Sequence, residues 1–218
     1  MSFFDKQSDQ VGVKICGITQ GDQAGQIVAL GPDAIGINFW PQSKRYIGFD
    51  QARPWLDELN GEVTRIGVFV NADSDEIIRI LESGAIDHAQ LHGDESIEEV
   101  ESLLNKGLSV YKALGIKDSA ALDNIASYPG DTILLDAYAP SEYGGTGEAF
   151  DWNLGRLAIE RFTDQKKIIL AGGLTPDNVA EAIQQVAPFA VDTASGVESG
   201  TPGIKDLDKV KRFIEAVR

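Results

Sequence analysis

Cysteine is almost absent from this sequence, which contains a single one, Cys16, among 218 residues. One thiol cannot form an intramolecular disulfide, so the cysteine content is typical of a reducing compartment. The two histidines, His88 and His92, have no cysteine near them, and no metal site is expected. Long apolar runs are also lacking, since no segment approaches the ~18 residues that a membrane-spanning helix requires.

Positive charge is scarce as well. Lysine and arginine total 19 against 34 acidic residues, which gives a net charge of -15. Nucleic acids and anionic membranes attract basic surfaces, so neither is an expected partner. The first ten residues, MSFFDKQSDQ, have no apolar core flanked by positive charge. We therefore expect no secretory signal and a cytoplasmic protein.

Short apolar runs rich in valine, isoleucine and leucine recur along the chain. The eight candidates are VGVKIC, DAIGINF, RIGVFV, HAQLH, LSVYKAL, TILLDA, KIILA and FAVDTAS. Most are continuously apolar rather than strictly alternating. This pattern is typical of strands that are covered on both faces of a parallel sheet.

Segments with helical spacing lie between these runs. Clear examples cover residues 74–84, 95–107 and 175–186. Thr175 and Pro176 have the chemistry of a helix start, whereas Gly84 and Gly107 have that of a helix end. We expect a helical stretch after each of the eight strands.

Eight strand–helix units in a chain of this length predict an α/β fold, a single-domain (β/α)₈ TIM barrel with eight parallel strands. The barrel would cover residues 11–218, with residues 1–10 as an N-terminal extension. An open doubly wound sheet is the alternative. No GxGxxG motif follows the first strand, which weighs mildly against that alternative.

Chemistry in such a barrel comes from the carboxyl ends of the strands and the loops that follow them. Cys16 ends the first strand, where a thiolate could remove a proton or attack a carbonyl. A small buried residue is the alternative interpretation. Asp136 and Asp192 close buried apolar runs, where a carboxylate is costly unless it lies in a polar site or pairs with a cation.

Arg45 and His92 can each be interpreted either as ligand contacts or as ordinary structural residues. Arg45 stands in the loop NFWPQSKRY after the second strand. It could clamp a carboxylate or phosphate beside aromatic rings, or it could be a solvated surface arginine. His92 follows the fourth strand and could contact a ligand or simply hydrogen-bond at the strand end.

Small residues follow the last two strands. Gly172 and Gly173 come after the seventh strand, and Ser195 and Gly196 after the eighth. In many barrels these two loops bind phosphate through backbone N–H groups. The alternative is that the glycines only permit tight turns.

These motifs together resemble the phosphoribosylanthranilate isomerase family. The resemblance extends from VKICGIT through GINFWPQSKRYI, GVFVN, QLHGDE, LLDAY, GGTGEAFDW and ILAGGLTPDNV to VDTASGVES and GIKD. It implies a cofactor-independent aldose–ketose isomerase of tryptophan biosynthesis, an intramolecular oxidoreductase. The implied reaction is the Amadori rearrangement of N-(5-phosphoribosyl)anthranilate to 1-(2-carboxyphenylamino)-1-deoxyribulose 5-phosphate.

The resemblance also assigns roles. By its place in these motifs, Cys16 resembles the family's general base and Asp136 resembles its general acid. Arg45 resembles the residue that holds the anthranilate carboxylate. The paired small-residue loops correspond to the phosphate site, and we expect His92 and Asp192 to contact substrate. The pKa values of Cys16 and Asp136 would both have to move towards neutrality, which predicts electropositive surroundings for the thiol and apolar ones for the acid.

A small phosphorylated molecule is then the expected partner, and the chain would be a monomer or homodimer. Two alternatives remain at this stage. One is another phosphosugar isomerase or epimerase, and the other is a non-catalytic barrel that binds a phosphosugar.

Overall fold

The computed structural model describes residues 3–5, 10–138 and 150–218. Eight parallel strands form a closed barrel in chain order, and β8 pairs with β1. The strands are β1 (Gly12–Cys16), β2 (Ala34–Asn38), β3 (Thr64–Phe69), β4 (His88–Leu91), β5 (Val110–Ile116), β6 (Thr132–Ala137), β7 (Lys167–Leu170) and β8 (Ala190–Thr193). The predicted (β/α)₈ barrel is therefore confirmed.

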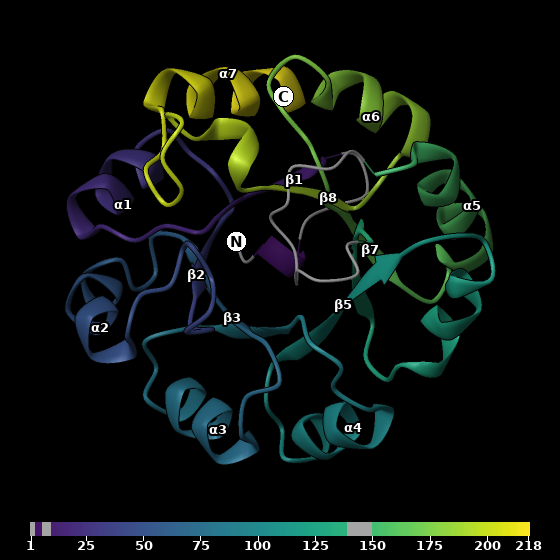
Figure 1. The fold of residues 1–218 in the computed structure, drawn as a ribbon, viewed down its shortest axis with the longest axis horizontal. Coiled ribbons are helices and arrows are strands. Elements are labelled where there is room, and N and C mark those ends of the chain that lie inside the picture. Colours follow the sequence, from purple (N-terminus) through teal and green to yellow (C-terminus); the bar gives the residue numbers. More distant parts are fainter. Residues whose placement is uncertain (1–2, 6–9, 139–149) are drawn as a thin grey trace.

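Helices surround the barrel as an outer ring (Figure 1). The α-helices are α1 (Gly21–Val28), α2 (Phe49–Glu58), α3 (Ser74–Glu82), α4 (Ile97–Asn105), α5 (Trp152–Phe162), α6 (Val179–Val186) and α7 (Leu207–Val217). Short 3₁₀ helices are η1 (Phe3–Asp5), η2 (Ala121–Ser127) and η3 (Ser195–Val197). Among the described helices, none is long and apolar enough to cross a membrane.

The helical stretch predicted after β5 is the 3₁₀ helix η2 and not an α-helix. Its two buried side chains, Leu122 and Ile125, are three residues apart. A 3₁₀ helix has three residues per turn, so this spacing puts both side chains on one face. The short segment thus covers its part of the barrel without a full α-helix.

Helix boundaries also shift slightly from those predicted. The last predicted start, Thr175 and Pro176, belongs to a turn, and α6 begins only at Val179. Asn178 accepts a hydrogen bond from the Thr175 N–H and so shapes that turn. The predicted ends are better placed, because Gly84 and Gly107 follow α3 and α4 with φ of 74° and 80°, where glycine is favoured.

Two apolar clusters fill the protein. The larger lies between strands and helices, and includes Ile15 and Ile37. The smaller cluster includes Ile66, Leu134 and Ile169 and fills the barrel interior. Along β6 and β7, its residues alternate with residues of the larger cluster. Phe3 of η1 joins this inner cluster and is 1% exposed.

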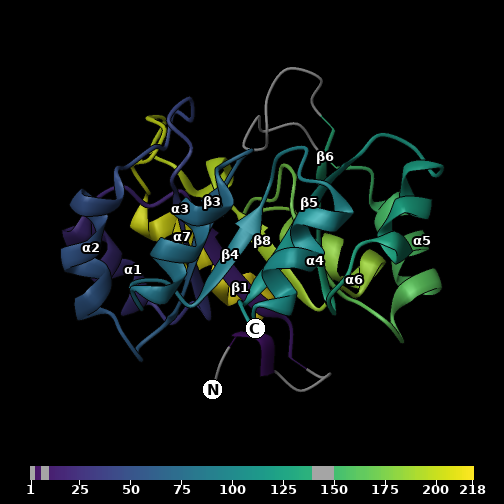
Figure 2. The ribbon, with the colours of Figure 1, turned by 90° about the horizontal axis from the view of Figure 1, so that it is seen from below.

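The N-terminal 3₁₀ helix covers the amino-terminal end of the barrel (Figure 2). The Phe3 N–H donates to Thr64 Oγ1 at 3.0 Å. A Cβ at Gly12 would lie 2.9 Å from the Phe3 ring, so the glycine makes room for it. With that end closed, the opposite end remains for a site.

Candidate active site

The predicted site residues all lie at the carboxyl ends of the strands. Cys16 is the last residue of β1, Asp192 lies in β8 and Asp136 in β6. His92 follows β4 directly, and Arg45 lies in the loop between β2 and α2. The closed parallel barrel brings these positions to one end of the molecule.

The thiol of Cys16 is partly buried and lies against β2. Cys16 and Gly36 are register partners in the β1–β2 ladder. A Cβ at Gly36 would overlap the Sγ atom, so the glycine provides the space that the thiol occupies. Gly17 then turns the chain with a φ of 76°, which glycine adopts without strain.

Burial raises the pKa of the Cys16 thiol, because it disfavours the thiolate. The positive charges of Lys14 and Lys205 act in the opposite direction, and Asp192 reinforces the rise. The surroundings thus contain the expected positive charge. The prediction that the thiol pKa is lowered was nevertheless wrong, since desolvation outweighs the two lysines.

Lys14 is a fully buried cation beneath this thiol. Its Nζ donates to Asp192 Oδ2 at 2.8 Å and to Gln90 Oε1 at 3.0 Å. Burial is the largest single effect and acts to lower the pKa of Lys14, but Asp192, Cys16 and Tyr111 together outweigh it and the pKa is raised. Asp192 Oδ1 is buried and has no hydrogen-bond partner within the described part of the chain.

Asp136 lies beside a histidine and a backbone turn. Its Oδ1 accepts the Ala137 N–H at 2.8 Å, and its Oδ2 lies 3.4 Å from His92 Nε2. A Cβ at Gly172 would lie 3.1 Å from Oδ1, so the loop after β7 approaches the carboxylate closely. Because His92 and a backbone N–H face the group, its surroundings are more polar than the sequence predicted.

Arg45 forms a buried ion pair and is 9% exposed, so it is not a solvated surface arginine. Its Nε and Nη2 donate to the two oxygens of Glu198 at 2.7 and 2.9 Å. Glu198 also accepts from Lys205 Nζ at 3.1 Å and from the Gly203 N–H at 2.8 Å. The Arg45 stem lies against Gly17, where a Cβ would overlap Cδ, and thus close to Cys16.

The loops after β7 and β8 pack on each other. Gly172 and Gly173 have φ of 86° and 67°. Thr193 Oγ1 donates to the Leu174 carbonyl at 2.7 Å, and a Cβ at Gly196 would overlap that same oxygen. Ser195 and Gly196 form the start of η3. Glycine is therefore required here by close backbone packing as well as by φ.

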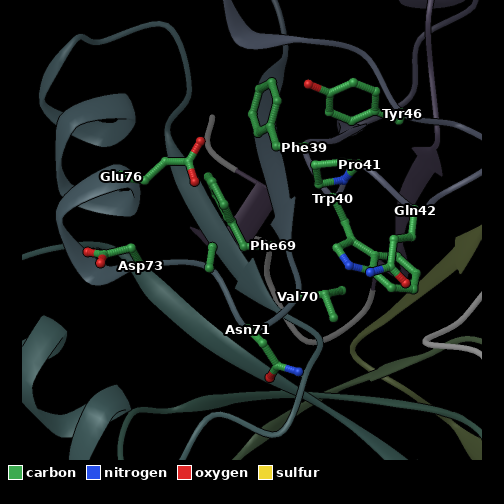
Figure 3. Close-up of a pocket in the computed structure, with 11 residues that line it drawn as sticks. Phe39, Trp40, Pro41, Gln42, Tyr46, Phe69, Val70, Asn71, Asp73 and Glu76 are labelled. Atoms are coloured by element: carbon green, nitrogen blue, oxygen red, sulfur yellow. The ribbon is translucent and has the colours of Figure 1, made fainter.

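A cavity of about 490 Å³ lies to one side, between the loops after β2 and β3 (Figure 3). Its lining combines aromatic side chains, among them Trp40 and Tyr46, with the acids Asp73 and Glu76. None of the predicted catalytic or binding residues lines it. The cavity thus neighbours the candidate site without containing it.

Sequence reasoning missed four polar residues of this site: Lys14, Gln90, Glu198 and Lys205. A usable signal existed for two of them. Lys14 precedes Cys16 by two positions and Gln90 precedes His92 by two, and alternate residues of a strand share a face. In the part of the chain that the structure describes, no group of histidine, cysteine and acidic residues could hold a metal ion.

Comparisons with known proteins agree with the motifs. The family model described as N-(5'phosphoribosyl)anthranilate (PRA) isomerase matches residues 13–216. The N-(5'-phosphoribosyl)anthranilate isomerase of Pseudomonas fluorescens is 47% identical over 210 residues, which cover 94% of each chain.

Solved structures of the same family are also similar to this chain. One contains monomers generated from the dimeric phosphoribosylanthranilate isomerase of Thermotoga maritima, with 38% identity and a TM-score of 0.82. Another is the isomerase in complex with reduced 1-(o-carboxyphenylamino)-1-deoxyribulose 5-phosphate, with 39% identity and the same TM-score. Each match covers 95% of this chain and 98% of the other. The chain therefore belongs to the phosphoribosylanthranilate isomerase family.

Proposed function

We propose that this isomerase uses Cys16 as the general base and Asp136 as the general acid of its reaction. The reaction is the aldose–ketose isomerisation of tryptophan biosynthesis that the family name denotes. The observation that carries the proposal is the position of both side chains at the same end of the barrel, on β1 and β6.

Asp136 begins the reaction by transferring its proton to the ribose ring oxygen as the C–O bond breaks, which opens the ring to a protonated imine. Its Oδ2 lies 3.4 Å from His92 Nε2, and its Oδ1 accepts a backbone N–H. The Ala137 N–H, and His92 Nε2 when it carries a proton, can stabilise the carboxylate that remains after the proton has left. The role of acid is therefore supported by groups that stabilise its conjugate base.

Cys16 then removes the proton from the carbon next to the imine, which gives an enolamine that tautomerises to the ketone. The thiolate is the effective base, and the charges of Lys14 and Lys205 favour it. Burial acts in the opposite direction and raises the pKa of the thiol, so the thiol must lose a proton before it can act as the base. The positive charge of the two lysines offsets part of this effect of burial.

Substrate binding is assigned to the surrounding loops. Arg45 would hold the anthranilate carboxylate, with Glu198 fixing the plane of its guanidinium. Asp192 is suited to a substrate hydroxyl, because its buried Oδ1 has no partner in the described residues. His92 would contact the same part of the substrate as Asp136.

The phosphate is assigned to the loops after β7 and β8. Four small residues there, Gly172, Gly173, Ser195 and Gly196, are partly exposed and carry no bulky side chain. Lysine is not required for such a site, since backbone N–H groups supply the donors. This placement also follows the common use of these two loops in barrels.

We also propose the domain bounds, the compartment, the partner and the assembly of this protein. We assign the catalytic domain to residues 11–218, residues 1–10 to an N-terminal extension and the protein to the cytoplasm. A small phosphorylated molecule is the partner. We leave monomer and homodimer as the two assemblies, because relatives include monomers derived from a dimer.

A direct fluorescence assay with freshly generated phosphoribosylanthranilate tests the proposal. We expect turnover by the wild type, and a ~10²–10⁴-fold lower kcat in Cys16→Ala and Asp136→Asn with KM little changed. Near wild-type kcat in either folded variant would remove that residue from the mechanism. A panel of other phosphosugars tests for a second isomerase or epimerase activity, and binding without turnover would indicate a non-catalytic barrel.

A further inference from the structure

Gln90 is a polar side chain buried in the barrel interior, with 1% of its surface exposed. It belongs to β4, where His92 follows it two positions later at the strand end. An amide in such a place is costly unless its oxygen and nitrogen both have partners. The hydrogen-bond partners of the Gln90 oxygen and nitrogen therefore indicate why an amide stands at this position.

The oxygen of the Gln90 amide is fixed by two donors. Oε1 accepts from Lys14 Nζ at 3.0 Å and from the Tyr111 hydroxyl at 2.8 Å. An ammonium group can only donate, so the amide oxygen and not the nitrogen must face Lys14. The amide nitrogen is then turned to the other side, where Nε2 lies 3.0 Å from His92 Nδ1.

This orientation selects one form of His92. The amide nitrogen of Gln90 can only donate, so His92 Nδ1 must accept and carry no proton. A neutral imidazole then has its proton on Nε2, the nitrogen that lies 3.4 Å from Asp136 Oδ2.

We propose that Gln90 is a positioning residue for the isomerisation, which holds the Nε2–H form of His92 against Asp136. The inference rests on the proposed role of Asp136 as the acid. When Asp136 has released its proton, the Nε2–H donates to the new carboxylate beside the Ala137 N–H. The opposite tautomer would present a lone pair to that charge and would destabilise the same state.

The first experiment measures the tautomer without any assay of activity. Protein labelled with ¹⁵N-histidine contains two imidazoles, and His88→Asn identifies the signals of His92. We expect wild-type His92 to show an unprotonated Nδ1 and a protonated Nε2 near neutral pH. A protonated Nδ1 in the wild type, in either the neutral or the charged ring, would overturn the proposal.

The second experiment compares two variants of Gln90 with the wild type. Gln90→Glu offers an acceptor in place of the donor, so His92 should become protonated on Nδ1. Gln90→Leu offers neither and should give a mixture of tautomers. Both should lower kcat by at least ~10-fold, with KM changed less, because the loss lies in the proton-transfer step.

Tyr111→Phe is the matched control. It removes one donor to Gln90 Oε1 but leaves Lys14 to orient the amide, so the Nε2–H form should persist. The inference fails if folded Gln90→Glu and Gln90→Leu keep the wild-type tautomer or the wild-type kcat. Failure of the proposed function is distinguishable, since it would appear as an active Asp136→Asn whatever the His92 tautomer.

Discussion

The guanidinium of Arg45 and the carboxylate of Glu198 face each other across two hydrogen bonds, Nε to Oε1 at 2.7 Å and Nη2 to Oε2 at 2.9 Å. The residues are 153 positions apart, and each comes from a loop at the carboxyl end of the barrel. A bidentate pair restrains the guanidinium in a plane as well as in position. This fixed orientation is what recognition of a planar carboxylate requires.

Removal of the Arg45 side chain should weaken substrate binding. We expect Arg45→Ala to lose about 1.5–3 kcal/mol in kcat/KM, the usual contribution of a hydrogen bond to a charged group. Arg45→Lys should recover this only in part, because a point charge replaces a planar fork. Steady-state kinetics measure both variants, and full activity of Arg45→Ala would move the carboxylate contact elsewhere.

The same ion pair makes stability depend on pH. Burial acts against ionisation of Glu198, but Arg45, Lys205 and the Gly203 N–H outweigh it and lower its pKa. A carboxyl whose pKa is lower in the folded state stabilises the protein above its unfolded pKa, and this contribution disappears as the pH falls through the folded value.

Urea unfolding of the wild type and Glu198→Gln between pH 7 and pH 3 measures this contribution. The wild type should be more stable at pH 7, and the difference should shrink progressively on acidification below the ordinary glutamate pKa of about 4.5. A difference that stays constant over this range would show that the charge of Glu198 contributes nothing to stability.

A negative charge in the proposed phosphate site should raise KM. Gly173 has a φ of 67°, a conformation that aspartate and asparagine tolerate better than most residues. We expect Gly173→Asp to raise KM strongly through repulsion of the phosphate. Gly173→Asn is the control, since it has similar size and backbone strain without the charge.

Inorganic phosphate provides a second measurement of that site. It should compete with substrate in the wild type and in Gly173→Asn, and compete less well in Gly173→Asp. Equal KM values for the two variants would mean that charge is not the cause, and the phosphate would then bind elsewhere.

The barrel was predictable because its determinants are local. Most strands are short, predominantly apolar runs buried on both sides, and the register of a parallel barrel brings the strand ends together. This is why Cys16, Asp136 and Asp192 could be chosen from sequence. The connection formed by η2 was not predictable in the same way, because a three-residue spacing of apolar side chains also suits an α-helix.

The polar contacts of the site depend on distant pairs and could not be predicted. Lys14 pairs with Asp192, which is 178 positions away, and with Gln90, which is 76 away. No local pattern reveals which acid neutralises a buried lysine. The direction of the Cys16 pKa was missed for a related reason, since the balance between burial and nearby charge exists only in the folded protein.

The pH dependence of catalysis should report the raised pKa of Cys16. Burial disfavours the thiolate, so the base is lost on acidification and kcat/KM should rise with pH. Because kcat/KM reports the free enzyme, the midpoint of this limb should lie above the ordinary thiol pKa of about 9.0. Lys205→Met removes a charge that favours the thiolate, so it should move the limb to still higher pH.

Two measurements tie that limb to the thiol itself. Cys16→Ser should lose the limb, because a serine hydroxyl does not ionise in this range. Alkylation of the wild type by iodoacetamide should accelerate along the same limb, since the thiolate is the nucleophile, and bound product should slow it. Replacement of Lys205 should shift alkylation and kcat/KM together. If the limb persisted in Cys16→Ser, or lay below pH 7 in the wild type, another group would be the base and the thiol would serve only to pack against Gly36.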